Sequence, residues 1–122
     1  MEPKEWLFES EGDIRKAKIL FKGNAFDGSV FYAQQSAEKS LKAVIIFLKK
    51  RLIRTHDLLL LSRMVDLPEN LLRKAVLLNP YYTTSRYPGV IKKRITLSET
   101  KVAINYAEEV FKWCKEKIET SK

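Results

Sequence analysis

The chain has 122 residues, of which 45% are apolar and 31% are charged, and its formal net charge is +8. This composition predicts one folded domain spanning residues 1–122 and excludes a disordered protein, which has too few apolar residues to form a core. The single cysteine, Cys114, excludes an intramolecular disulfide and suits a reducing cytoplasm. One cysteine and one histidine cannot fill a tetrahedral zinc site, and no apolar run reaches the roughly 20 residues of a membrane span. We therefore expect a cytoplasmic protein with no metal or other cofactor and no membrane contact.

The positive charge is concentrated in the middle of the chain. Residues 51–97 contain 9 basic and 3 acidic side chains, which leaves +6, whereas residues 1–50 contain 9 and 7 and residues 98–122 contain 5 and 5. A local basic field suits a partner that carries phosphate, such as a nucleotide or RNA. Charge alone leaves open the alternative of a solvated basic surface that only aids solubility.

Two long helices are predicted in the first half of the chain. Residues 3–22 form the first, because Pro3 suits a first helical turn and Gly23 follows the last apolar position. Residues 25–50 form the second and clearest, with a length of about 40 Å that is typical of the spine of a bundle. Apolar residues recur along it at spacings of three and four, namely at Phe26, Val30, Ala33, Ala37, Leu41, Val44 and Leu48.

Shorter elements are predicted next. Thr55 is a plausible N-cap for a helix over residues 56–65, and Pro68 is expected at the first position of a helix that ends near Asn79. Residues 79–97 are expected to form a long connection, and connections longer than about 12–15 residues are usually functional or disordered.

Ser98 is expected to cap a last helix over residues 99–119. Its apolar face is wider than one neighbouring helix needs, so it must contact two helices of the bundle or a partner chain. Together these elements predict an all-α fold, an antiparallel bundle of four to five helices.

Three short motifs follow one another in the chain. Residues 32–43 read YAQQSAEKSLKA, residues 55–58 read THDL, and residues 86–88 read RYP. In this order and helical context they resemble the HEPN domain family of small all-α prokaryotic proteins, over nearly the whole chain. The resemblance implies a helical bundle that forms a homodimer. It also implies a frequent partner, a minimal nucleotidyltransferase, in a toxin–antitoxin or nucleotide-handling pair.

The resemblance also suggests site residues. Many relatives are metal-independent ribonucleases with an arginine, four to six residues, and then a histidine, and Arg51 and His56 meet this spacing. These two are the candidate catalytic residues. The candidate residues for binding a ligand and its phosphates are Lys39, Lys42, Tyr82, Arg86 and Tyr87.

Several candidates have a plainer interpretation. His56 could be a structural residue at the start of a helix, held by a loop carbonyl or by Asp57. Lys42 could form an exposed i,i+4 ion pair with Glu38, worth only a few tenths of a kcal/mol. Arg86 and Tyr87 could latch their loop onto the bundle.

The sequence thus favours a nucleotide- or RNA-binding protein that is the partner of a minimal nucleotidyltransferase in a toxin–antitoxin-like module. One alternative is a metal-independent endoribonuclease that uses Arg51 and His56. A second alternative is a non-catalytic helical interaction module with the broad face of the last helix as its interface.

Overall fold

The structure is a computed structural model that describes residues 1–84 and 94–120, with Thr84 described by its backbone alone. These residues form six helices and no strand, which confirms the predicted all-α fold. The helices are α1 (Pro3–Lys22), α2 (Phe26–Lys49), α3 (Leu58–Met64), α4 (Glu69–Leu77), α5 (Tyr81–Thr84) and α6 (Leu97–Thr120). Five of them correspond to predicted helices, and α5 is a single turn within the predicted connection. Among the described helices, none is long and apolar enough to cross a membrane.

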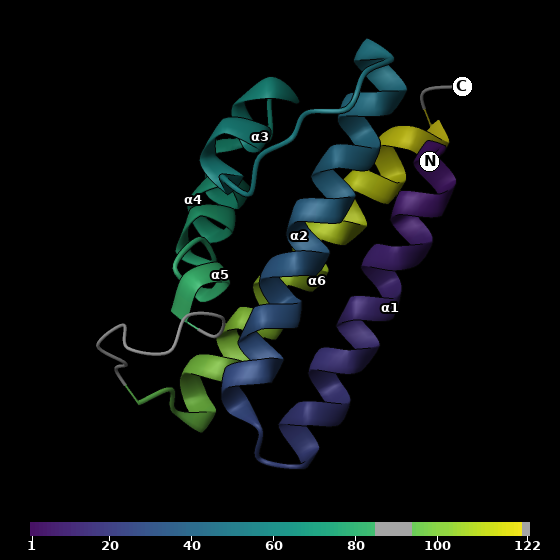
Figure 1. Ribbon diagram of the computed structural model, residues 1–122. Helices are drawn as coiled ribbons and strands as arrows, with labels where there is room; N and C mark the ends of the chain where they lie inside the picture. Colours follow the sequence, from purple (N-terminus) through teal and green to yellow (C-terminus); the bar gives the residue numbers. More distant parts are fainter. Residues whose placement is uncertain (85–93, 121–122) are drawn as a thin grey trace.

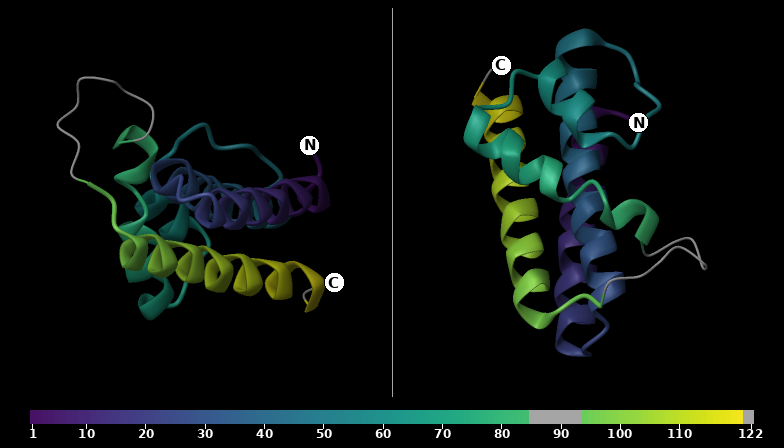
Figure 2. Two further views of the ribbon diagram at one scale, coloured as in Figure 1. Left: turned by 90° about the horizontal axis from the view of Figure 1, so that it is seen from below. Right: turned by 90° about the vertical axis from the view of Figure 1, so that its left-hand side faces the viewer.

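The three long helices, α1, α2 and α6, lie side by side (Figure 1). A short turn at residues 23–25 joins α1 to α2, so these two helices are antiparallel. The short helices α3, α4 and α5 then carry the chain back along the bundle. As a result α6 runs in the same direction as α2, and the short helices form a second layer over α2 and α6 (Figure 2).

The central element of the bundle is α2, which packs against α1, α3, α5 and α6. Most of its predicted apolar stripe is buried, with Val30, Ala33 and Leu41 fully removed from solvent, whereas Leu48 near the end of the helix is 45% exposed. Because neighbours cover most sides of this helix, the polar positions beside the stripe are buried as well. Glu38 is 4% exposed and Lys42 is 7% exposed. The interpretation of these two residues as an exposed surface pair is therefore wrong.

The last helix, α6, packs against α1, α2 and α4. This confirms the expectation that its broad apolar face needs more than one neighbour.

Two helix caps differ from the prediction. The α3 helix is capped by Asp57, whose side chain accepts a hydrogen bond from the Leu59 N–H at 3.0 Å, and not by Thr55. At the start of α6, Thr96 Oγ1 accepts from the Glu99 N–H at 3.0 Å, so Thr96 takes the place expected for Ser98. Either residue type can cap a helix, and the backbone path chooses which one does.

Candidate functional site

A buried carboxylate, that of Glu38, organises a polar cluster on α2. Its Oε1 accepts from His56 Nδ1 at 2.9 Å, and its Oε2 accepts from Lys42 Nζ at 2.8 Å. A third donor, Gln34 Nε2, lies 3.2 Å from Oε1. A carboxylate this deeply buried requires such partners, because an unpaired buried charge costs several kcal/mol.

The imidazole of His56 is oriented by this carboxylate. An ionised carboxylate accepts hydrogen bonds and donates none, so we assign the ring proton to Nδ1, which leaves Nε2 as an acceptor. The partner of Nε2 is Tyr82, whose Oη lies 2.9 Å away. Glu38, His56 and Tyr82 therefore form a polar line from the buried face of α2 outwards. The His56 side chain is 51% exposed, so its ring is accessible from solvent.

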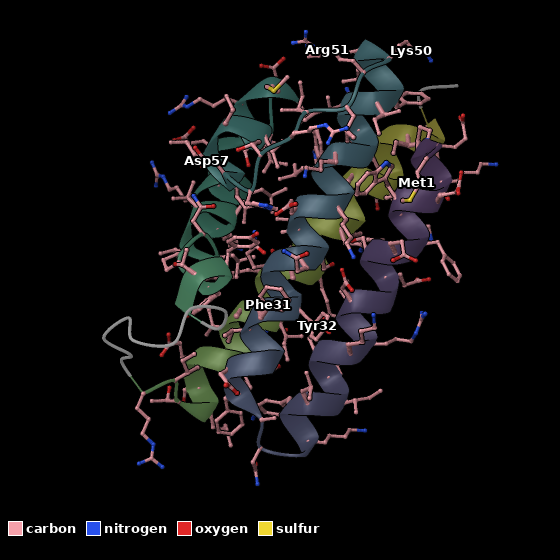
Figure 3. The ribbon with its side chains drawn as sticks, in the orientation of Figure 1. Met1, Phe31, Tyr32, Lys50, Arg51 and Asp57 are labelled. Atoms are coloured by element: carbon pink, nitrogen blue, oxygen red, sulfur yellow. The ribbon has the colours of Figure 1, made fainter. Side chains whose placement is uncertain are left out.

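Three elements bring this line together, since Glu38 lies on α2, His56 on the α2–α3 connection, and Tyr82 on α5. The rings of His56 and Tyr82 stack with centroids 4.0 Å apart and an interplanar angle of 19°. The Phe31 ring of α2 lies 6.3 Å from the Tyr82 ring, which places α5 against α2. Figure 3 shows Phe31 on α2 and Asp57 at the start of α3, on the side where the short helices lie.

The segment that follows His56 is held by two hydrogen bonds to the side chain of Asn79. Asn79 Oδ1 accepts from the Leu58 N–H at 2.8 Å, and Asn79 Nδ2 donates to Asp57 Oδ1 at 3.2 Å. Asp57 is therefore occupied by the α3 cap and by Asn79, and the imidazole of His56 is held by Glu38 instead. Such a fixed loop presents the ring in one orientation.

The structure separates Lys39 from this cluster. Its ammonium lies 2.9 Å from Asp13 Oδ2 of α1, so Lys39 is at the contact of α2 with α1 and not at its contact with the short helices. Burial raises the pKa of the Asp13 carboxyl, and the neighbouring Lys39 partly offsets this rise. Lys42, in contrast, is in the cluster, but its charge is held by Glu38.

The end of α2 and the α2–α3 connection carry four exposed cations, Lys49, Lys50, Arg51 and Arg54, which we call the basic connection. Within the described residues, none of them is in an ion pair. No hydrogen bond or ion pair in that part of the chain links Arg51 to His56, although the two are close in sequence. Arg51 instead lines a groove at the end of α2 with Trp6.

The remaining two predicted residues, Arg86 and Tyr87, lie outside the described residues. Across residues 1–84 and 94–120, no group of three or more His, Cys, Asp or Glu side chains is placed to hold a metal ion. Cys114 is fully buried, and burial raises the pKa of its thiol to about 12, so it stays protonated and unreactive at neutral pH.

Comparison with known proteins identifies the family. Residues 3–117 match the sequence model of the HEPN domain. The chain belongs to the HEPN domain family. This confirms the resemblance drawn from the three sequence motifs.

Two solved structures have the same fold. The crystal structure of TT1696 from Thermus thermophilus superimposes with a TM-score of 0.86 at 27% identity, over 94% of this chain and 97% of that one. The crystal structure of ST0689, an archaeal HEPN homologue, gives a TM-score of 0.81 at 27% identity, over 97% of this chain and 98% of that one.

A shorter match links the chain to a curated protein of Methanocaldococcus jannaschii named "Putative toxin MJ1304". The two are 42% identical over 43 residues, which is 35% of this chain and 28% of that protein. This chain therefore matches somewhat more than a quarter of that relative's length.

Proposed function

We propose that this HEPN protein is a toxin-like component of a two-protein module and binds nucleoside phosphates, free or within RNA, beside His56. The observation that carries this proposal is an exposed imidazole oriented by a buried carboxylate next to the basic connection. The His56 side chain is half-exposed, so a ligand can reach the ring that Glu38 orients. A buried charge is costly unless it is paired, and part of the pairing of Glu38 is with the imidazole that it orients.

The basic connection supports a ligand that carries several phosphates. Its four cations are not neutralised within the described residues, so a bound phosphate releases counterions without first breaking a protein ion pair. Arg54 is two residues before His56 and is the cation of this set nearest to it in sequence. A strand that follows the connection thus reaches the imidazole.

Binding can be measured by fluorescence anisotropy of labelled decauridylate over a range of salt concentrations. The His56→Ala variant is expected to lose affinity at least tenfold. The Arg54→Gln variant is expected to lower the slope of log affinity against log salt by about 0.7, the value for one phosphate contact on a single strand. The matched control is Arg73→Gln, which removes the same charge from an exposed position on α4. If both site variants bind as well as this control, the proposed site is wrong.

The name of the relative from Methanocaldococcus jannaschii supports the toxin role, and the HEPN resemblance supports a minimal nucleotidyltransferase as the partner. Expression of the wild-type chain in a bacterial host is expected to arrest growth, and co-expression with a minimal nucleotidyltransferase from the same genome is expected to relieve the arrest. The His56→Ala variant should not arrest growth. If this variant arrests growth at the same protein level as wild type, toxicity does not depend on the His56 cluster.

A second candidate function, a metal-independent endoribonuclease, is favoured by the line from Glu38 through His56 to Tyr82. The RNA 2′-hydroxyl would replace Tyr82 at His56 Nε2 and give this nitrogen its proton, while Glu38 stabilises the imidazolium through Nδ1. The 2′-oxygen would then bond to phosphorus as the bond to the 5′-oxygen breaks, and the leaving oxygen would take a proton from water. Arg51, a catalytic candidate suggested by the HEPN resemblance, would contribute through phosphate contact along the basic connection.

Cleavage of a mixed-sequence RNA in excess chelator tests this chemistry. Wild type is expected to cleave, and His56→Ala is expected to be at least 100-fold slower, since a positioned acid or base contributes about 10²–10⁴-fold. Binding without cleavage by a well-folded wild type would reject the ribonuclease and keep the binding function.

A further inference from the structure

A second site lies at the far end of α2, in a groove between the start of α1 and the basic connection. The groove has a volume of about 650 Å³, within the usual range of small-molecule sites of roughly 300–1,000 Å³. Figure 3 shows Lys50 and Arg51 at the end of α2, at the same end of the molecule as Met1. We call this hollow the Trp6 groove.

The Trp6 groove is lined by both aromatic and cationic side chains. Trp6 and Phe47 provide aromatic surface, and three cations, Lys4, Lys50 and Arg51, line it against one carboxylate, that of Glu2. The Glu2 side chain is used in the capping box of α1. This combination fits a ligand with a flat apolar body and an anionic group, which describes the base and phosphate of a nucleotide.

The backbone of Lys50 gives independent support. Among the described residues other than glycine, three have a positive φ, and two of them are Asn24 and Asp66, types that tolerate this conformation. The third is Lys50, with φ of 58° at the C-cap of α2, where glycine is the usual choice. Lys50 Nζ lies 5.8 Å from the centroid of the Phe47 ring, which also lines the groove. Lysine therefore occupies an unfavourable backbone position that places its charge over this groove.

Lys42 connects the Trp6 groove to the His56 cluster. Its ammonium is bound to Glu38 and lies 5.9 Å from the centroid of the Trp6 ring. Along α2 the distance from Glu38 to Phe47, which lines the groove, is about 14 Å, at about 1.5 Å per residue. A short RNA strand can therefore reach both places, with the basic connection between them.

We infer that the Trp6 groove is a nucleotide subsite, which holds the base of one nucleoside monophosphate unit against Trp6 and Phe47 and its phosphate at Lys4 and Lys50. This inference rests on the proposed function and extends it, because it assigns a second nucleotide of the same strand. A strand bound at both places is held in one register relative to His56.

The experiment uses Trp6 as its own reporter. The chain has two tryptophans, and Trp113→Phe leaves Trp6 alone. Uridine monophosphate is expected to change Trp6 fluorescence saturably in this variant, more strongly than uridine or inorganic phosphate at equal concentration. Adding Lys4→Gln and Lys50→Gln is expected to weaken this binding at least tenfold. The control pair Lys101→Gln and Lys112→Gln removes the same charge from exposed positions on α6 and should have no effect.

The outcomes separate the groove from the His56 site. In one outcome, decauridylate binding depends on His56, but it does not change Trp6 fluorescence, and the Lys4/Lys50 variant binds decauridylate as tightly as wild type. This outcome overturns the groove assignment and keeps the proposed function. In a second outcome, uridine monophosphate changes Trp6 fluorescence, but His56→Ala binds decauridylate as tightly as wild type. This outcome keeps the groove assignment and overturns the proposed function. A response to inorganic phosphate equal to that of uridine monophosphate reduces the groove to a phosphate site and overturns the nucleotide assignment. Because the Lys4 and Lys50 side chains are exposed, loss of folding should not confuse these results.

Discussion

Replacing Glu38 by glutamine should weaken the fold and the site together, because this carboxylate balances a buried ammonium. The side chains of Glu38 and Lys42 are 5% and 8% exposed and lie 2.8 Å apart. Glu38→Gln keeps the size of the side chain but leaves the Lys42 charge buried without its partner. Breaking a buried ion pair from one side typically costs about 3–5 kcal/mol. For a domain of this size that corresponds to a fall in Tm of roughly 10–20 °C.

Removing both charges should behave differently. In the double variant Glu38→Leu with Lys42→Met no buried charge remains, and such apolar replacements are often neutral or stabilising. The free energy of unfolding of the double variant should therefore fall by only about 1–3 kcal/mol, less than for Glu38→Gln, because the buried Gln34 Nε2 loses its acceptor. The double variant should still lose binding at the His56 cluster, because Nδ1 has lost its acceptor as well. Urea unfolding followed by circular dichroism measures the first quantity, and decauridylate anisotropy measures the second.

Two results would refute this reasoning. A cost below about 1 kcal/mol for Glu38→Gln would mean that Lys42 finds water or another partner. Wild-type RNA affinity in the stable double variant would mean that orientation of His56 by Glu38 has no role in binding.

Three further predictions concern other parts of the molecule. Because the folded-state pKa of Asp13 is raised above its unfolded value of about 3.9, the stability that Asp13 contributes is present at low pH and is lost as pH rises through the folded-state pKa. The difference in unfolding free energy, Asp13→Asn minus wild type, should therefore increase from pH 3 to pH 7, and a flat or falling difference would contradict the raised pKa. Lys50→Gly should raise the free energy of unfolding in urea by about 1 kcal/mol, because glycine adopts the left-handed conformation without steric strain. The same variant should bind uridine monophosphate more weakly. Unchanged stability would mean that Lys50 is not strained. The homodimer that the resemblance implies should have twice the chain mass of 14.2 kDa in light scattering at high concentration, and a mass of 14.2 kDa there would reject it.

Local patterns in the sequence were enough to place the long helices. Pro3 and Gly23 mark the two ends of α1, and the regular apolar spacing of α2 runs along the whole predicted helix. Each helix end is therefore determined by residues that are close to it in sequence. The three motifs likewise depend on order and spacing alone, and the HEPN family match confirms them. The caps at Thr55 and Ser98 were predicted wrongly, because neighbouring residues of equal capping ability compete and the backbone decides between them.

The candidate site, in contrast, was decided by tertiary structure. Glu38, His56 and Tyr82 come from three elements, and no periodicity relates a position on α2 to one on α5. The sequence left open whether Lys42 binds phosphate or forms a surface pair with Glu38, since the spacing of four residues is the same on any helix face. Only the packing of α1, α3, α5 and α6 around α2 removes this pair from water, and that burial makes the carboxylate depend on His56 and Lys42 as partners.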